Sequence, residues 1–273
     1  RHVLLCPTSD PSETFPLRLA KWRKQGLIKV RSLGFPAYHG IHWHPLAPRP
    51  RGGEEWLGVH RAIDYWVVHS REDALRYRDR RVFFAFLPSS PSNRGFAHSN
   101  DVDVFVGGRQ NRDFLISFQA VSKLERSAIF LSDLLPDSLQ VGSNSPIELI
   151  RERVPKSKYI EVMSRGLIIG IPLSRPSVPR AQGQTDASLA MALGIPIIAT
   201  RDASVNDYVS SGETGFLVPN TKRAWEQAIE KILCDYESFR ARALARRHLA
   251  SWERFRQVTS ELRDERAEPG RAR

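Results

Sequence analysis

Residues 183–219 decide the fold, and they read GQTDASLAMALGIPIIATRDASVNDYVSSGETGFLVP. The small and apolar residues at the start of this stretch predict a short helix that Thr185 caps. Gly194 stands where a left-handed residue would end this helix, and Pro196 prevents the helix from continuing. The wholly apolar run at 197–199 then predicts a parallel strand that is covered on both faces.

The second part of the stretch repeats this alternation of elements. A short helix is expected at 206–209, Gly212 and Gly215 bracket a tight turn, and the next strand is expected at 216–218. The first junction suggests a function. A loop containing Gly183 enters a helix N-terminus, where unpaired amides and the positive end of the helix dipole favour a bound anion.

These features resemble the donor-binding half of retaining glycosyltransferases of the GT-B fold, in particular glycosyltransferase family 4. Members have a glycine-containing loop, a helix of small residues, a Gly-x-Pro strand and a Gly-x-x-Gly turn in this order. The resemblance implies an α/β protein with two Rossmann-like domains that face a cleft. The family pattern also places two glutamates around the loop, and this chain has Ala181 and Leu189 there. An ordinary βαβ unit of another doubly wound protein is the alternative interpretation.

Length and composition agree with two α/β domains. The chain has 273 residues, of which 41% are hydrophobic, so it can bury two cores. No apolar stretch is long enough to cross a bilayer. Cys6 and Cys234 lie far apart and suggest neither a disulfide framework nor a thiolate metal site. We therefore expect a cytoplasmic protein.

The positive charge is concentrated in the first part of the chain. Residues 1–99 hold 16 Lys and Arg against 8 Asp and Glu, while the whole chain has a net charge of +11. A basic acceptor domain would suit an anionic membrane surface, with peripheral attachment at its inner face, or a lipid-linked acceptor. A merely arginine-rich composition is an equally open explanation. No nucleic-acid motif is present, so no nucleic-acid partner is expected.

The order of expected elements gives the domain organisation. Residues 1–99 form the acceptor domain, which the family resemblance implies is incomplete, and residues 100–249 form the donor domain. Residues 250–273 form a last helix and a disordered basic tail. Strands are expected at 3–6, 28–33, 65–68, 82–86, 102–106, 128–131 and 167–171. Further helices are expected at 113–124, 155–165 and 224–233.

The motif GGRQNRD at 107–113 is the first candidate site. Gly107 and Gly108 let the backbone approach a ligand closely, and Arg109 and Arg112 offer charge and forked donors. The motif resembles the family loop in which a basic pair clamps the donor diphosphate. Arg112 would replace the family's lysine, with a spacing one or two residues short. A surface turn with solvated arginines is the alternative.

The loop before the central helix is the second candidate site. The amides of Gly183, Gln184 and Thr185, with the Thr185 hydroxyl, are expected to hold phosphate oxygens. Asp186 suits the helix dipole but repels a diphosphate, so it would face either the sugar hydroxyls or solvent. Leu189 stands where the family has a glutamate for the nucleotide ribose, and it can accept no hydrogen bond.

Three histidines form the third candidate site. His39, His42 and His44 lie in a Pro- and Gly-rich stretch. The family resemblance implies a histidine near the transferred sugar, which either His39 or His42 would replace, and we assign this role to His39. A zinc site and a plain surface loop are the alternatives. The pair Asp101 and Asp103 is better explained as the start of a domain than as a metal motif. We expect no metal and no cofactor.

The resemblance implies a metal-independent, retaining glycosyltransferase that uses a nucleotide-diphosphate-sugar donor. Its acceptor would be a glycan or a lipid-linked sugar, as in polysaccharide biosynthesis. Glycosyl transfer passes through an oxocarbenium-like transition state, so the site must stabilise the departing diphosphate. The missing glutamates favour a rival hypothesis, a catalytically degenerate GT-B binding or regulatory module. A nucleotide-sugar epimerase is a third, less favoured hypothesis.

Overall fold

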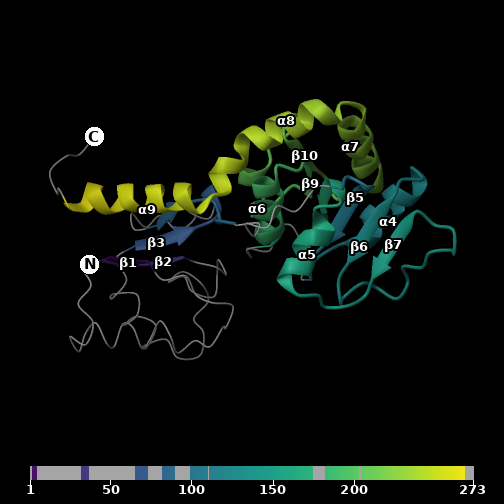
Figure 1. Cartoon of the computed structure of the whole chain (residues 1–273), viewed down its shortest axis with the longest axis horizontal. Helices are drawn as coiled ribbons and strands as arrows, with labels where there is room; N and C mark the ends of the chain where they lie inside the picture. The colour runs from purple at the N-terminus through teal and green to yellow at the C-terminus, as the bar shows by residue number, and fades with distance from the viewer. Residues whose placement is uncertain are drawn as a thin grey trace. The chain divides into compact units, whose positions relative to one another are not determined.

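The computed structural model (Figure 1) describes residues 2–4, 32–36, 65–72, 82–89, 99–109, 111–174, 182–202 and 204–267. Contacts divide these residues into two compact units, which meet in the chain between Ala85 and Phe86 and again between Arg256 and Gln257. The domain limits expected from the sequence remain a prediction.

The first unit contains a parallel four-stranded sheet. Its strands lie in the order β1-β2-β3-β4 and are β1 (His2–Leu4), β2 (Ser32–Pro36), β3 (Tyr65–Val68) and β4 (Val82–Phe84). The strand predicted at 65–68 is confirmed. The strand predicted at 28–33 lies later, because pairing of Gly34 with Tyr65 sets the register. Local alternation of side chains cannot reveal that pairing.

The second unit contains a parallel six-stranded sheet in the order β10-β9-β8-β5-β6-β7. Its strands are β5 (Val102–Gly107), β6 (Ala128–Leu131), β7 (Ile147–Ile150), β8 (Gly166–Ile171), β9 (Ile197–Thr200) and β10 (Gly215–Val218). From β5 the chain moves outward to β7, returns to β8 on the other side of β5, and continues to β10. The strand order therefore reverses between β5 and β8, and open α/β sheets bind ligands outside the strand ends at such a point.

Along the chain, helices lie between and after these six strands (Figure 1). They are α4 (Phe114–Lys123), α5 (Lys156–Met163), α6 (Gln184–Leu193), η1 (Asn206–Tyr208), α7 (Lys222–Cys234), α8 (Tyr236–Arg246), η2 (Arg247–Ala250) and α9 (Trp252–Ala267). The helices expected at 113–124, 155–165 and 224–233 are confirmed with small shifts of their ends. No predicted element corresponds to α8, which buries only Phe239 and Ala243, or to β7.

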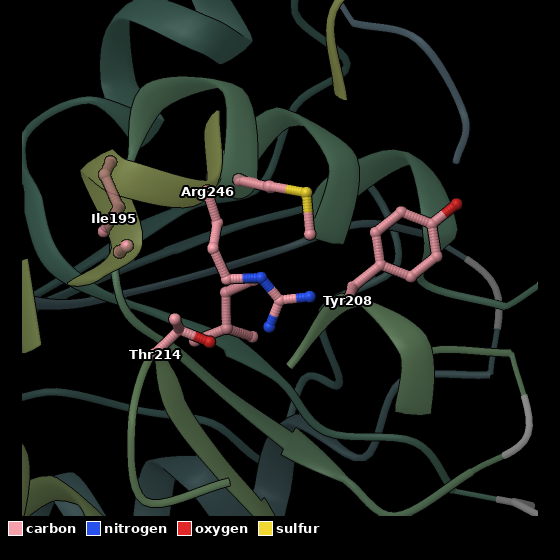
Figure 2. A pocket seen from close by; sticks show the side chains of 7 residues that line it. Ile195, Tyr208, Thr214 and Arg246 are labelled. Atoms are coloured by element: carbon pink, nitrogen blue, oxygen red, sulfur yellow. The ribbon is translucent and has the colours of Figure 1, made fainter. Parts of the chain in front are cut away.

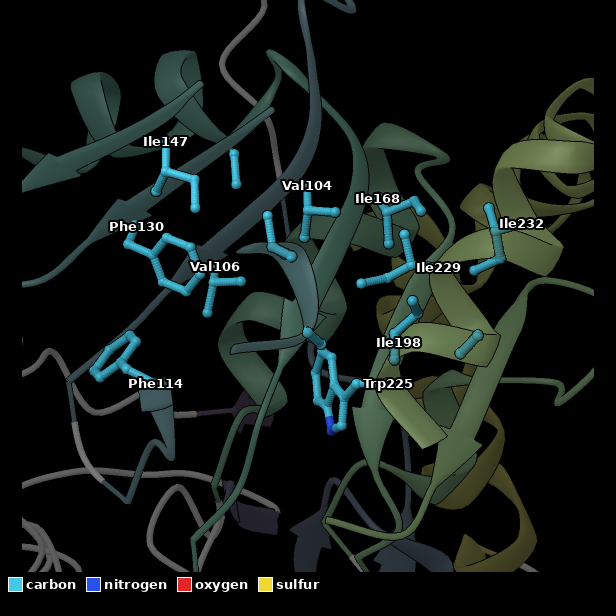
Figure 3. Close-up of a cluster of buried hydrophobic side chains, with 14 of the residues drawn as sticks. Val104, Val106, Phe114, Phe130, Ile147, Ile168, Ile198, Trp225, Ile229 and Ile232 are labelled. Carbon is cyan, nitrogen blue, oxygen red and sulfur yellow. The ribbon is translucent and has the colours of Figure 1, made fainter. Parts of the chain in front are cut away.

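A hydrophobic core lies between the sheet and the pair α4 and α7 (Figure 3). Val104 and Val106 of β5 point to this core, and Trp225 of α7 is fully buried in it. Phe105, between the two valines, points to the opposite face and contacts the Tyr159 ring of α5 edge to face at 5.5 Å. The central strand β5 is thus apolar on both faces, as a parallel strand with helices on both sides requires.

Two glycines control the ends of α6. Gly194 ends the helix with φ +66°, as predicted, and a Cβ there would lie 2.6 Å from Leu244. At the start, Gly183 is the N-cap residue with φ +72°. The prediction that Thr185 caps this helix is therefore wrong. The left-handed glycine starts the helix two residues earlier, so Thr185 lies inside the first turn, where it is exposed.

The turn between Gly212 and Gly215 is confirmed. The Gly212 amide donates to the Gly215 carbonyl at 2.8 Å, and both glycines have positive φ. A Cβ on Gly215 would lie 1.8 Å from the Ile197 carbonyl oxygen, so only glycine fits beside β9.

Within the described residues, no helix combines the length and apolar character needed to span a membrane.

Candidate functional site

Two loops meet where the strand order of the sheet reverses. One follows β5 and the other follows β8. The Asp113 amide donates to the Pro172 carbonyl at 3.0 Å, and the Ser174 amide donates to the Asn111 carbonyl at 3.1 Å. Arg112 and Leu173 also form an isolated antiparallel bridge. These backbone contacts place the GGRQNRD motif beside the loop that leads into α6.

Polar side chains extend this connection to β9 and to the end of β10. Thr200 accepts a hydrogen bond from the Leu173 amide at 3.0 Å and donates one to Asn220 at 3.2 Å. The Asn220 side chain in turn donates to Asp113 at 2.8 Å. The loops at the carboxyl end of the sheet are therefore linked to one another by side chains as well as by backbone.

The N-terminus of α6, which was predicted to be a cradle for an anion, begins at Gly183. The first intrahelical bond runs from the Ala187 amide to the Gly183 carbonyl, so the amides of residues 184–186 precede the helical hydrogen-bonding pattern. A Cβ on Gly183 would lie 2.7 Å from Ile171 and 3.1 Å from Val205, which leaves room only for glycine. The buried strand β8 thus holds the helix N-terminus close to the loop after β5.

Arg112 links the two loops through its side chain. Its Nε donates to the Gly107 carbonyl at 3.1 Å, and its Nη2 donates to Asp186 Oδ2 at 2.6 Å. The side chains of the pair are 5% and 10% exposed. Asp186 therefore does not face solvent, which was one of the two orientations considered for it. The carboxylate lies in the first turn of α6, where the helix dipole stabilises negative charge.

Tyr159 of α5 holds the other oxygen of the same carboxylate. Its hydroxyl donates to Asp186 Oδ1 at 2.8 Å. Burial, together with the adjacent negative charge of Asp186, raises the pKa of Tyr159 well above its usual value. A Cβ on Gly107 would lie 2.3 Å from the Tyr159 hydroxyl, so the glycine makes room for this contact. No motif in the sequence pointed to Tyr159, because its role depends on packing between α5 and β5.

Arg109 lies in a different environment from Arg112. Its side chain is 52% exposed, and its Nε donates to Asp133 Oδ1 at 2.8 Å. This hydrogen bond lowers the pKa of the Asp133 carboxyl. Asp133 follows β6, and a polar residue after a parallel strand is a signal that the sequence analysis did not use. Of the two arginines assigned to a diphosphate clamp, one is exposed and the other is already paired inside the protein.

Leu189, the residue at one of the two glutamate positions, is part of the protein interior. Its side chain is 2% exposed on α6. The neighbouring Ser188 donates to the Leu87 carbonyl at 2.5 Å and to the Ser89 hydroxyl at 2.7 Å. The side chain of Gln184, whose amide is one of those expected to hold phosphate oxygens, is also buried. Ala181 and the candidate residue His39, with His42 and His44, lie outside the described residues.

Asp101 and Asp103 lie at the opposite end of β5 from the cradle. Asp101 pairs with Arg165 at 2.9 Å, and Asp103 accepts hydrogen bonds from the Ser127 amide and hydroxyl at 3.0 Å. These contacts are structural, which supports the interpretation of the two residues as the start of a domain. The described part of the chain contains no group of three His, Cys, Asp or Glu side chains that could hold a metal ion.

A small hollow lies elsewhere in the second unit, between α6, β9 and α8 (Figure 2). Its bounds contain about 210 Å³ of empty space, a volume that includes open solvent. The lining is mainly apolar, with Arg246 and Tyr208 among its side chains, and the Arg246 guanidinium donates to the Ser210 hydroxyl. The cradle residues do not line it, so this hollow is separate from the candidate site.

Comparison with known families identifies the segment that contains α6. Residues 176–235 match the family model described as glycosyl transferases group 1. The matched segment begins in the loop after β8, includes α6, β9 and β10, and ends just after α7. No curated protein sequence gives a match.

Solved structures resemble most of the chain. Sucrose-phosphate synthase from Thermosynechococcus elongatus matches with a TM-score of 0.57 and 18% identity, over 90% of this chain and 70% of its own. HepE from Anabaena in complex with UDP gives 0.63 and 14%, over 93% and 77%. A glycosyltransferase from Rickettsia africae gives 0.61 and 15%, over 98% and 86%. At these identities the likeness is one of fold, and it confirms the predicted GT-B fold.

Proposed function

We propose that this protein is a glycosyltransferase that moves a sugar from a nucleotide-diphosphate-sugar donor to an acceptor. One observation carries the proposal. The segment that matches group 1 glycosyl transferases contains the N-terminus of α6, which lies where the strand order reverses. This is the place in an open α/β sheet where a phosphate group finds backbone donors and a favourable helix dipole.

The residues around the N-terminus of α6 have different roles in binding the donor. The amides at the start of α6 hold phosphate oxygens, and Gly107 and Gly108 let the donor approach the loop after β5. Arg109 is the accessible cation, because more than half of its side chain is exposed. These groups stabilise the charge that develops on the departing diphosphate, which is the main task of a site for glycosyl transfer. Arg112 positions the loop after β5 against α6.

The nucleotide we test first is uridine diphosphate. HepE has been solved with UDP and with UDP-glucose, and the chain shares its fold. We further propose a retaining, metal-independent reaction without a cofactor. Amides and arginines supply the positive charge that a metal ion would otherwise bring to the diphosphate.

The acceptor belongs to the other domain. The excess of basic residues in 1–99 supports a glycan or lipid-linked acceptor and peripheral attachment of a cytoplasmic protein to an anionic membrane. Polysaccharide biosynthesis is the process that such an acceptor would serve.

A specific observation favours a second function, that of a degenerate GT-B binding module. The position of the ribose-binding glutamate is taken by Leu189, which is 2% exposed and offers the ribose no acceptor. Turnover separates the two functions. A transferase releases UDP and labelled sugar from UDP-glucose, whereas a binding module leaves the donor intact.

Calorimetric titration with UDP and GDP tests the donor site. Arg109→Ala should weaken nucleoside diphosphate binding by about 1.5–3 kcal/mol, the range for hydrogen bonds to charged groups. Arg165→Ala is the matched control, because Arg165 also pairs with an aspartate but lies near the N-terminal end of β5. The wild type and this control should bind equally.

Two outcomes of the titration would contradict the assignment. If Arg109→Ala binds like the wild type, the exposed arginine is not part of the donor site. If no variant binds either nucleotide, including the wild type, the proposed glycosyl transfer fails as a whole.

A further inference from the structure

The cradle contains an anion of its own. Asp186 lies in the first turn of α6, with one carboxylate oxygen held by Arg112 at 2.6 Å and the other by Tyr159 at 2.8 Å. A phosphate at the start of α6 would seek the same helix dipole and the same guanidinium. Asp186 therefore occupies the electrostatic position of a ligand phosphate.

The ion pair is buried, so the interaction between its two charges is strong. With side chains 5% and 10% exposed, neither charge is well screened by water. A buried cation that loses an ion-pair partner is strongly destabilised, so a nearby anion stabilises Arg112 in this position. Either Asp186 or a phosphate can supply that negative charge. When one of them is paired with Arg112, the other gains less stabilisation from the same guanidinium.

Two glycines keep the pair next to the cradle. A Cβ on Gly108 would lie 2.9 Å from Arg112 Nη2 and 3.0 Å from Asp186 Oδ2, and a Cβ on Gly183 would lie 3.7 Å from Arg112 Nη2. The ion pair is thus in contact with both loops that form the candidate site. A phosphate bound by these loops feels both the guanidinium and the carboxylate.

We propose that Asp186 is an internal counter-anion of the donor site, which pairs with Arg112 in the empty site and competes with donor phosphates for it. This inference rests on the proposed function. Asp186 then sets the charge preference of the site. A free nucleoside diphosphate carries one more ionised phosphate oxygen than its sugar ester, because the terminal phosphate has a second pKa near 6. Asp186 therefore disfavours the released diphosphate more than the nucleotide-sugar donor.

Replacement of the carboxylate by its neutral amide tests the competition. Asp186→Asn should bind UDP roughly tenfold more tightly than the wild type, which corresponds to about half of one unit-charge interaction at about 6 Å near a protein surface. The gain for UDP-glucose should be smaller, because it carries less charge. The ratio of UDP affinity to UDP-glucose affinity should therefore rise, as measured by calorimetric titration at constant ionic strength.

Three further variants make the result specific. Asp101→Asn removes the same charge from a pair at the opposite end of β5 and should change neither affinity. In an Arg112→Gln background, the gain from Asp186→Asn should fall well below tenfold, since the shared guanidinium is absent. Tyr159→Phe keeps the ion pair but removes one hydrogen bond to the carboxylate, so it should give a weaker gain even if Asp186→Asn folds poorly.

The outcomes separate this inference from the proposed function. Weaker or unchanged UDP binding by folded Asp186→Asn, with wild-type binding intact, overturns the counter-anion role and leaves the glycosyltransferase standing. Equal gains for UDP and UDP-glucose overturn the charge preference. Absence of uridine nucleotide binding in every variant, including the wild type, overturns both proposals.

Discussion

Arg109 and Arg112 show how much a side chain depends on its surroundings. They are three residues apart in one motif, yet Arg109 is half exposed and Arg112 is buried against Asp186. Their common charge predicted a clamp of two equal cations. In the folded protein, Arg109 reaches solvent although it pairs with Asp133, whereas Arg112 must be released from a buried partner before it can bind a ligand.

A second single residue, the buried His69, predicts how the stability of the protein depends on pH. It is 2% exposed after β3, its Nδ1 donates to the Ala85 carbonyl at 2.8 Å, and burial lowers its pKa to about 4 despite that hydrogen bond. The folded protein thus keeps the imidazole neutral, while the unfolded chain protonates it near its usual pKa of about 6.5. Between these values the unfolded state binds more protons, so stability falls as the pH drops from about 6.5 to about 4, by on the order of 3 kcal/mol.

Urea unfolding at a series of pH values measures this loss. In His69→Asn, whose amide can replace the Nδ1 donor, the decrease over this window should be smaller by about that amount. His248→Asn, at an exposed position, should retain the wild-type dependence. An unchanged pH dependence in His69→Asn would show that the buried imidazole is not responsible.

At the scale of elements, the helices that follow β8 and β10 begin in different ways. Helix α6 begins at a left-handed glycine, whereas α7 begins at Thr221, whose hydroxyl accepts a hydrogen bond from the Ala224 amide at 3.4 Å. The glycine start leaves the first amides of α6 without a capping side chain, which suits a ligand-binding helix. The threonine cap of α7 serves only to stabilise that helix.

A pair of threonine substitutions tests this difference. Thr221→Ala should lower the free energy of unfolding by about 1 kcal/mol, the usual value of an N-cap. Thr185→Ala, at an exposed position inside the first turn of α6, should have almost no effect on stability. Chemical denaturation of the two variants measures both values. Equal losses would mean that Thr185 caps its helix after all.

At the scale of the whole molecule, the excess of positive charge and the reversal of strand order lie in different parts of the chain. The described residues of the proposed donor site lie in the second unit, where the strand order reverses. The excess of positive charge lies in residues 1–99, with 16 basic against 8 acidic side chains. Recognition of the donor and attraction to an anionic surface are therefore assigned to different parts of the chain.

Vesicle sedimentation tests the second assignment. The protein should bind phosphatidylcholine vesicles that contain phosphatidylglycerol, and raising the ionic strength should release it, because salt screens contacts of basic residues with anionic lipid. Pure phosphatidylcholine vesicles are the control and should bind little. Equal binding to both kinds of vesicle would contradict an electrostatic contribution from the basic residues.

Sequence by itself determined the features that depend on neighbours along the chain. The apolar run at 197–199, the left-handed Gly194 and the Gly212–Gly215 turn each follow from local stereochemistry, and their order predicted the GT-B fold. Tertiary structure alone decided which charges meet. Arg112, Tyr159 and Asp186 come from three distant segments, and only the packing of α5 and α6 against β5 and β8 brings them together. Long-range pairing also set the register of β2, because hydrogen bonds between strands and the energetics of buried charge depend on distance in space rather than on distance in sequence.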